Sequence, residues 1–161
     1  MVSVRPLRKE DNFQDLVALS KAFFEEYERH REDFFEIDRL EDQAILDYFS
    51  LFLEQDDHAA FIALRNDRIV GYITVRVERQ PAYWTVTRIG HISGLMVNKE
   101  NRRQGIGGQL LDQAMIYFRC QRVRYYTLHT SVENRGAIQF YQARGMVPLR
   151  TELAGEVAKG S

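Results

Sequence analysis

The spacing of apolar residues changes along the chain from a helical period to short strand-like runs and back. Apolar positions recur at helical spacing over residues 11–27 and again from Asp38, where Asp38 and Glu41 have the form of a capping box. Two apolar runs joined by a polar turn then predict a hairpin. The predicted elements are, in order, a strand at 2–7, helices at 11–27 and 38–52, strands at 59–64, 69–77 and 86–97, a helix at 105–121, a strand at 124–131, a helix at 134–144 and a strand at 146–151.

This order of elements predicts a mixed sheet, antiparallel over its first strands, with helices on its faces. We expect one domain over residues 1–153 and a disordered tail at 154–161, which is small and polar. The chain has no apolar run of the ~18–20 residues that a membrane helix needs, and its start lacks a secretory signal. These features favour a cytoplasmic protein with no membrane partner. The lone Cys120, in an apolar helix, is expected to be a buried thiol.

Charge is distributed unevenly along the chain, although the formal total is only −1. Residues 1–60 hold 16 Asp and Glu against 7 Lys and Arg, a balance of −9, and residues 61–161 hold 7 against 15, a balance of +8. A duplex-binding protein would have a broad basic face, so we expect no nucleic-acid partner. Two interpretations stay open: two solvated surfaces, or one half suited to an anionic ligand and the other to a cationic one.

The most informative stretch runs from Gly94 to Leu111, where an apolar strand ends, a polar turn carries Arg102 and Arg103, and glycines open a helix. Glycine lets the backbone approach a ligand closely. The first turn of a helix adds free N–H groups and the positive end of the helix dipole. These features favour a phosphate or pyrophosphate ligand, although a glycine-rich helix start without a ligand also fits.

Two nucleotide-binding motifs fit this stretch poorly. The run Gly-x-x-x-x-Gly-Lys-Ser/Thr of a P-loop does not occur in the sequence. A dinucleotide fingerprint would need a third glycine where Leu110 stands, and it would follow the first strand of a parallel unit. Here the turn that contains Arg102, Arg103 and the glycines up to Gly108, called the glycine turn, follows the fourth predicted strand.

The glycine turn resembles the cofactor motif of the GNAT superfamily of acetyltransferases, Arg/Gln-x-x-Gly-x-Gly/Ala, as Arg102-x-x-Gly105-x-Gly107. A second segment resembles the family's Asn-x-x-Ala-x-x-x-Tyr-x-x-x-Gly-Phe run and is carried by Asn134, Ala137, Tyr141, Gly145 and Met146, with Met146 in place of Phe. The resemblance implies an α/β (α+β) fold with a mixed, mostly antiparallel sheet of about six to seven strands and about four flanking helices. In this family two strands splay apart and hold the cofactor between them.

The resemblance implies an N-acetyltransferase that uses acetyl-coenzyme A as co-substrate. The backbone of residues 95–97 would pair with the pantetheine arm, and N–H groups of residues 103–108 would hold the pyrophosphate. The residues implied for cofactor binding are Leu95, Met96, Val97, Arg102, Arg103, Gln104, Gly105, Ile106, Gly107, Gly108, Asn134 and Tyr141. Asn134 would contact the arm or act as a plain helix N-cap, and the two roles are compatible. We expect no metal, because the four histidines are scattered.

Tyr141 matches the family's tyrosine near the cofactor sulfur, which implies the role of general acid; the alternative is an aromatic residue packed on the sheet. A backbone N–H near Met96 or Val97 would polarise the thioester carbonyl. Many members of the family use ordered water as the base, so the base need not be a side chain.

His91 is the candidate general base, because it lies on the strand that leads to the glycine turn. Strand alternation predicts that it shares a face with Ser93 and Leu95, and a structural hydrogen bond is the alternative role. Glu78, at the end of the preceding strand, is a second candidate base. His129 is assigned no role.

The acceptor would be a primary amine: a small cationic amine, an amino acid or a peptide amine. In this fold the first two helices form one wall of the acceptor site, and here that stretch is acidic, which suits a cation. The carboxylates are those of Glu25, Glu26, Glu28, Glu32, Asp33, Glu36, Asp38, Glu41 and Asp42; solvated helix faces are the alternative. Arg76, Arg79 and Arg88 equally favour an acceptor that bears a carboxylate.

Two other classes of function stay open. One is a non-catalytic domain that binds acetyl-coenzyme A as a sensor or regulator. The other is a protein that binds a different phosphate ligand such as a nucleotide. Homodimers are common in the GNAT superfamily, which makes a homodimer the candidate assembly.

Overall fold

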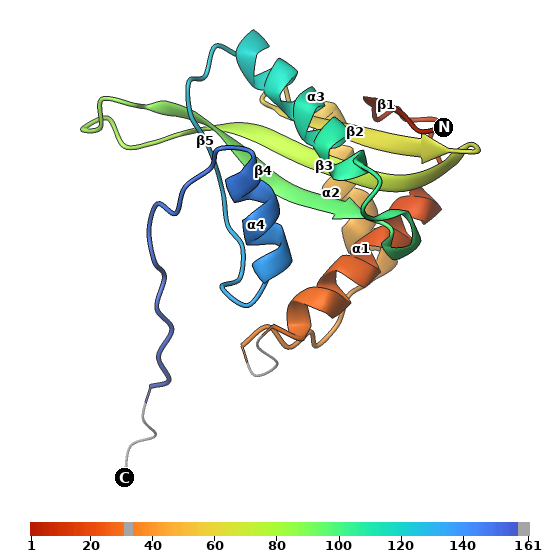
Figure 1. Ribbon diagram of the computed structural model, residues 1–161, viewed down its shortest axis with the longest axis horizontal. Helices are drawn as coiled ribbons and strands as arrows, with labels where there is room; N and C mark the ends of the chain where they lie inside the picture. The colour runs from red at the N-terminus through yellow and green to blue at the C-terminus, as the bar shows by residue number, and fades with distance from the viewer. Residues whose placement is uncertain (31–33, 158–161) are drawn as a thin grey trace. The chain divides into compact units, whose positions relative to one another are not determined.

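The computed structural model describes residues 1–30 and 34–157. Its contacts divide the chain into two compact units, Met1–His129 and Thr130–Ser161. The predicted single domain over 1–153 stays a prediction. The larger unit holds the sheet and its helices, and the smaller one holds a single helix (Figure 1).

The larger unit contains a five-stranded sheet in the order β1-β2-β3-β4-β5. All neighbouring strands are antiparallel except β4 and β5, which are parallel. Its elements are β1 (Ser3–Pro6), α1 (Phe13–Glu28), α2 (Asp42–Glu54), β2 (His58–Arg65), β3 (Arg68–Arg79), β4 (Arg88–Val97), the 3₁₀ turn η1 (Lys99–Asn101), α3 (Ile106–Cys120) and β5 (Tyr126–Leu128). The smaller unit contains α4 (Arg135–Ala143).

Helices α1 and α2 cover one face of the sheet (Figure 1). Because side chains alternate along a strand, each strand sends every second residue to this face. The buried cluster on it comprises Leu7, Leu16, Val17, Leu19, Ile45, Phe49, Phe52, Ala60, Ile62, Ile69, Tyr72 and Met96. Asn12 caps the start of α1 by accepting a hydrogen bond from the N–H of Gln14, at 3.1 Å.

Helix α3 covers the opposite face with an apolar stripe of Ile106, Leu110, Leu111, Ala114 and Phe118, all buried. The helix approaches the sheet closely at two glycines of the strands, Gly71 and Gly90. A Cβ built on Gly71 would lie 3.2 Å from Leu110 Cδ1, and one built on Gly90 would lie 2.5 Å from the Phe118 ring. Glycine at these strand positions therefore lets the helix approach the sheet.

The predicted capping box is wrong, because α2 begins at Asp42 and not near Asp38. The residue at the N-cap is Glu41, and it makes no side-chain cap hydrogen bond. Its carboxylate pairs instead with Arg39 on the preceding turn. The glutamate that a capping box places on the third helical residue thus stands before the helix.

The last predicted strand, at 146–151, does not form, so the described residues contain five strands instead of six to seven. Val147 and Leu149 are 77% and 70% exposed, and they bury too little apolar surface to hold a strand in place. The strand predicted at 124–131 is reduced to three residues, Tyr126–Leu128. Cys120 is exposed and not buried, because it is the last residue of α3.

Candidate active site

The two edges of β4 are paired to different extents. One edge pairs with β3 from Arg88 to Val97, with Ser93 as the one unpaired residue between them. On the other edge, β5 pairs only with residues 90–92 and ends at Leu128. Residues 93–97 therefore have no strand partner on that edge within the described part of the chain. Because β5 ends while β4 continues, this edge of β4 is open over residues 93–97.

A β-bulge at Ser93 interrupts the pairing of β4 with β3. Thr74 pairs with Gly94 and Val75 with Ile92, which leaves Ser93 without an opposite residue. Beyond the bulge, the N–H of Asn98 donates to Val70 on β3 at 2.7 Å. Because N–H directions alternate along a strand, the N–H group of Met96 also points to β3. The N–H groups of Leu95 and Val97 point to the open edge.

The open edge leads into the glycine turn and the start of α3. Gly105, the N-cap residue, has a φ of 80°, a left-handed conformation that favours glycine, and it offers no side chain to cap the helix. The first intrahelical bond at this end runs from Gln109 to Gly105. The N–H groups of residues 106–108 thus have no partner within the helix and lie at the positive end of its dipole, as an anion site requires.

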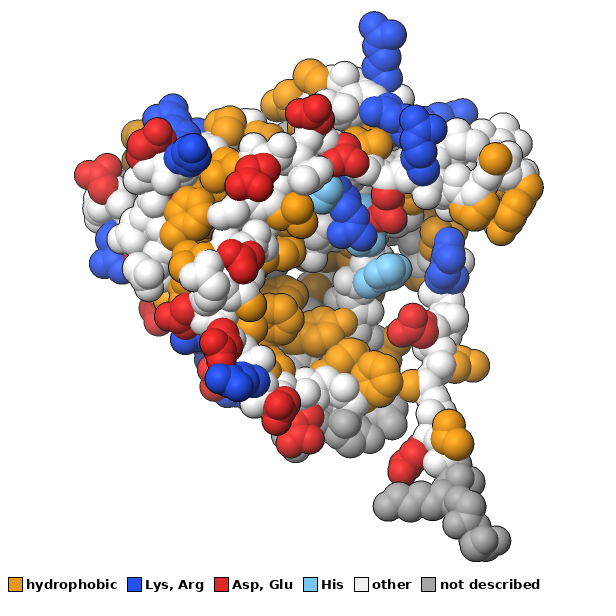
Figure 2. Space-filling view, turned by 180° about the vertical axis from the view of Figure 1, so that it is seen from behind, with side chains coloured by type: hydrophobic (Ala, Val, Ile, Leu, Met, Phe, Trp, Pro, Cys, Tyr) orange, Lys and Arg blue, Asp and Glu red, His pale blue; other side chains and the backbone are white. Residues whose placement is uncertain are grey.

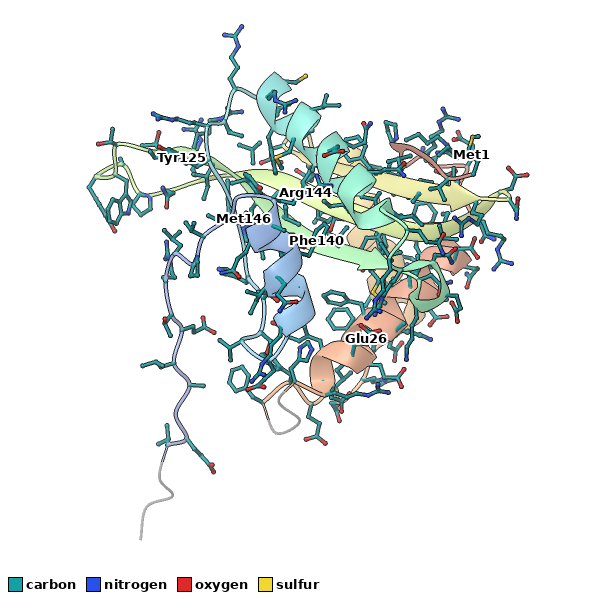
Figure 3. The ribbon with its side chains drawn as sticks, in the orientation of Figure 1. Met1, Glu26, Tyr125, Phe140, Arg144 and Met146 are labelled. Carbon is teal, nitrogen blue, oxygen red and sulfur yellow. The ribbon has the colours of Figure 1, made fainter. Side chains whose placement is uncertain are left out.

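The first arginine of the glycine turn is held by the protein itself. Arg102 Nε donates to the Val97 carbonyl at 2.9 Å, and its terminal NH2 group donates to Glu26 Oε1 on α1 at 2.8 Å. Figure 3 labels Glu26 on α1. The neighbouring Arg103 is exposed with a φ of 62°. Arg102 thus ties the end of β4 to α1, and Arg103 is the arginine left to meet an anion.

Gln104 is also engaged, since its Oε1 accepts a hydrogen bond from Arg65 on β2 at 2.6 Å. Arg65 donates to Asn101 as well. Sequence reasoning missed Arg65 and placed Glu26 only in the acidic wall of the acceptor site, because only the fold brings these two residues to the glycine turn. No local pattern in the sequence signals either contact.

His91 lies on β4 and is 7% exposed. Its Nδ1 is 3.0 Å from Thr127 Oγ1 on β5 and 3.2 Å from Glu78 Oε1 on β3. Burial lowers the pKa of His91; Arg76 and His129 act in the same direction, and Glu78 opposes them. The neutral imidazole is therefore favoured, which is the form that can accept a proton.

His91 shares a sheet face with Arg76, its partner on β3, and Arg76 donates to Ser93 Oγ at 3.2 Å. Leu95 pairs with Ile73 and so lies on the opposite face. The prediction that His91, Ser93 and Leu95 share one face is wrong for Leu95, because the bulge shifts the alternation by one residue.

His129 is a residue that sequence reasoning missed. Its ring lies 5.2 Å from the His91 ring, at a steep interplanar angle of 62°. The side chain of His129 is exposed, whereas that of His91 is buried. Figure 2 shows histidine side chains beside acidic and basic ones on the face seen there. The parallel pairing of β4 with β5 produces this contact, and a single sequence does not reveal it.

In the smaller unit, Asn134 is the N-cap of α4 and accepts a hydrogen bond from the N–H of Ala137 at 3.2 Å. This confirms the N-cap role; a contact with the pantetheine arm stays a prediction. Tyr141 lies on α4, with its ring 5.1 Å from that of Phe140. Figure 3 labels Phe140 and Arg144, whose guanidinium lies 5.8 Å from the Phe140 ring centroid.

Several carboxylates of the acidic stretch are paired with arginines. Glu25 pairs with Arg29, and Glu26 with Arg102. A cavity of about 440 Å³ lies between α1 and the end of β4, and its lining holds both signs of charge. Its charged residues are Asp15, Glu25, Glu26, Glu100, Arg29, Arg68 and Lys99. Glu32 and Asp33 lie outside the described residues.

The part of the chain that the structure describes contains no group of three or more His, Cys, Asp or Glu side chains that could hold a metal ion. None of its helices combines the length and the apolar character needed to cross a bilayer.

Two curated relatives match part of the chain. N-alpha-acetyltransferase 30 of Schizosaccharomyces pombe is 30% identical over 97 residues, which is 60% of this chain and 63% of that protein. N-alpha-acetyltransferase daf-31 of Caenorhabditis elegans is 32% identical over 75 residues, which is 46% of this chain and 40% of that protein. The matches thus span less than two thirds of the length of these relatives.

Solved structures share the fold over nearly the whole chain. A tetramutant of the BH1408 protein of Bacillus halodurans has a TM-score of 0.83 at 19% identity, and covers 96% of this chain and 99% of its own. Aminoglycoside N-acetyltransferase AAC(6')-Iy in complex with CoA has a TM-score of 0.78 at 18% identity, and covers 98% and 95%. At this identity the likeness concerns the fold, and it confirms the predicted GNAT-like architecture.

The family model that matches the sequence is that of the acetyltransferase (GNAT) family, and the match covers residues 16–146. This range runs from within α1 to beyond the end of α4, and it includes the open edge of β4 and both motifs on which the resemblance rests. The chain belongs to the acetyltransferase (GNAT) family.

Proposed function

We propose that the protein transfers the acetyl group of acetyl-coenzyme A to a primary amine. The observation that carries the proposal is the open edge of β4, which runs directly into the uncapped start of α3. An amide-rich chain can pair with such an edge as an added strand, and a pyrophosphate can bind the helix N–H groups that follow it. One ligand that joins both features is coenzyme A. The CoA complex of AAC(6')-Iy, a protein of the same fold, supports this choice.

The residues proposed to hold acetyl-coenzyme A divide by chemistry. Leu95 and Val97 offer backbone N–H groups at the open edge, and residues 104–108 offer those of the turn and the helix start. Arg103 contributes a positive charge that no described carboxylate pairs with. Asn134 and Tyr141 are proposed as part of the site only because they match the second family motif.

The chemistry proposed is direct attack of the amine in a ternary complex. Acetyl-coenzyme A supplies an activated thioester. His91 accepts a proton from the acceptor ammonium, the neutral amine forms a bond to the acetyl carbonyl carbon, and the carbon–sulfur bond breaks. Tyr141 gives its hydroxyl proton to the departing thiolate, and the second proton, which the attacking nitrogen loses on becoming an amide, returns through solvent to the Tyr141 oxygen. The outward N–H groups of Leu95 or Val97 would stabilise the carbonyl oxygen as charge develops on it.

The acceptor is proposed only as a class: a primary amine of a small cationic molecule, an amino acid or a peptide. The names of the relatives point to two such classes, protein N-terminal amines and aminoglycosides. The pairing of Glu25 and Glu26 with arginines weakens the argument for a highly charged polyamine.

A thiol-release assay with acetyl-coenzyme A against peptides, aminoglycosides, amino acids and polyamines tests the proposal. We expect release that depends on one acceptor class. If no acceptor class causes thiol release while coenzyme A still raises the melting temperature, the result would instead support the non-catalytic sensor.

The site itself is tested by Gly107→Glu, which brings a side chain and a negative charge to the proposed pyrophosphate site. We expect at least a 100-fold loss of affinity for coenzyme A, which is about 2.7 kcal/mol. Gly155→Glu is the matched control, because a Cβ at Gly155 meets nothing within 4 Å. Calorimetric titration measures both, and unchanged affinity in the folded Gly107→Glu variant would remove the basis of the assignment.

A further inference from the structure

One half of a sheet face carries polar side chains that packing does not explain. Arg76 and Glu78 on β3, His91 on β4 and Thr127 on β5 lie side by side at the end of the sheet away from the α1 and α2 core. His91 is 7% exposed, and burial of an ionisable group without a partner is costly. An apolar side chain at this position would avoid that cost. Since His91 is the proposed base, its partners bear on catalysis.

Two oxygens from different strands approach the same ring nitrogen of His91. Thr127 Oγ1 is 3.0 Å from Nδ1 and forms a hydrogen bond with it, and Glu78 Oε1 is 3.2 Å from the same atom. An ionised carboxylate can only accept a hydrogen bond, so its charge favours a proton on Nδ1. The oxygen of the threonine hydroxyl then accepts a hydrogen bond from Nδ1–H. A neutral imidazole carries one proton, so Nε2 keeps its lone pair.

We propose that Glu78 and Thr127 are positioning residues that hold the proton of His91 on Nδ1 and leave Nε2 to accept the proton of the acceptor amine. The inference rests on the proposed function and deepens it. Thr127 fixes the ring by its hydrogen bond from β5, and Glu78 selects the tautomer by its charge. When Nε2 gains a proton, the carboxylate also stabilises the imidazolium, as the third member of a catalytic triad does.

The charged groups around His91 act in opposite directions. Glu78 raises the pKa of His91, whereas Arg76 from β3 and His129, which follows the end of β5, lower it. Arg76 is also 3.5 Å from Glu78, so the guanidinium and the imidazole share this carboxylate. Glu78 therefore keeps His91 more basic than burial alone would leave it. Without Glu78, the base would be neutral at lower pH but would attract the amine proton more weakly.

The test compares Glu78→Gln, Thr127→Val, Thr127→Ser and His91→Gln with Glu10→Gln, an exposed control next to β1 at the far edge of the sheet. The pH dependence of kcat/KM is measured with an active acceptor. We expect His91→Gln to lose on the order of 100-fold in kcat together with the limb that rises with pH. Glu78→Gln should lose on the order of 10-fold and shift that limb to lower pH, because the group that raises the His91 pKa is gone.

Thr127→Val should lower kcat on the order of 10-fold, and Thr127→Ser, which keeps the hydroxyl, should restore most of it. The ¹⁵N spectrum of His91 reports the tautomer directly. We expect one Nδ1–H form in the wild type at neutral pH and a mixture in Thr127→Val and Glu78→Gln. The melting temperature and the Kd for coenzyme A identify variants that fail to fold or to bind.

The possible failures are distinguishable. An unshifted pH limb in Glu78→Gln and one tautomer in every variant would overturn the positioning roles, even with His91→Gln inactive. Wild-type turnover in His91→Gln would overturn His91 as the base. No acceptor-dependent transfer by the wild type would overturn the proposed function itself.

Discussion

The two faces of β3 and β4 differ in what they bury. Toward α3, the side chains of both strands are apolar along the length of the contact: Ile73, Val75, Val77 and Ile92. Toward α1 and α2, the strands are apolar only as far as Tyr72 and Met96. From Thr74 onward the same face becomes polar, with Arg76, Glu78 and His91 next to one another.

This difference separates packing from chemistry within one pair of strands. The α3 face gains stability from apolar area removed from water, and any shape-preserving apolar residue would serve there. The polar half of the other face contributes little of that kind. Its side chains are held by directed contacts between atoms, and these contacts begin where the bulge at Ser93 changes the alternation of β4. Substitutions on the first face should therefore change stability, and those on the second should change activity.

The largest expected effect on the apolar face comes from Phe118→Ala. Phe118 is 4% exposed, stacks on Tyr126 and fills the space above Gly90. Its removal leaves a cavity and should lower the free energy of unfolding by about 3–5 kcal/mol, measured by urea denaturation. The pH profile of the remaining folded enzyme should be unchanged. A shift of that profile would show that the two faces are not independent.

A smaller loss is expected from Gly90→Ala, which adds a methyl group to the same contact. Its Cβ would lie 2.5 Å from the Phe118 ring, so the ring must move, at a cost of about 1–3 kcal/mol. Gly136→Ala, in α4, is the matched control, because a Cβ there meets nothing within 4 Å. The control should gain up to about 1 kcal/mol from helix propensity. Equal denaturation midpoints for the two variants would contradict close packing at Gly90.

The smallest effect is expected from Tyr48→Phe, at the border between the two halves of the other face. Tyr48 and the fully buried Thr74 share a hydrogen bond of 2.8 Å, and its loss should cost about 1 kcal/mol. Burial raises the pKa of Tyr48 above its ordinary 10.0, so the unfolded chain releases this proton first and stability falls as the pH rises past 10.0. Tyr48→Phe should reduce this loss of stability at high pH. An unchanged pH dependence of unfolding would exclude this contribution.

Local patterns predicted the central elements well. The apolar runs at 59–64 and 69–77 became β2 (His58–Arg65) and β3 (Arg68–Arg79), and the stripe at 105–121 became α3 (Ile106–Cys120). The glycine turn and the N-cap role of Asn134 were also predictable, because both depend on neighbouring residues. Predictions that needed a distant partner failed. The strand expected at 146–151 has no partner strand among the described residues, and Cys120, which was expected to be buried, lies at the exposed end of α3.

The sequence by itself determined the family, the order of the elements as far as α4 and the glycine turn, since each depends on the spacing of residues along the chain. Only the tertiary structure decided which side chains meet. The bulge at Ser93 moved Leu95 to the opposite face from His91, and the parallel pairing of β4 with β5 brought Thr127 and His129 to His91. Contacts of this kind depend on strand register, which is fixed by packing across the whole sheet.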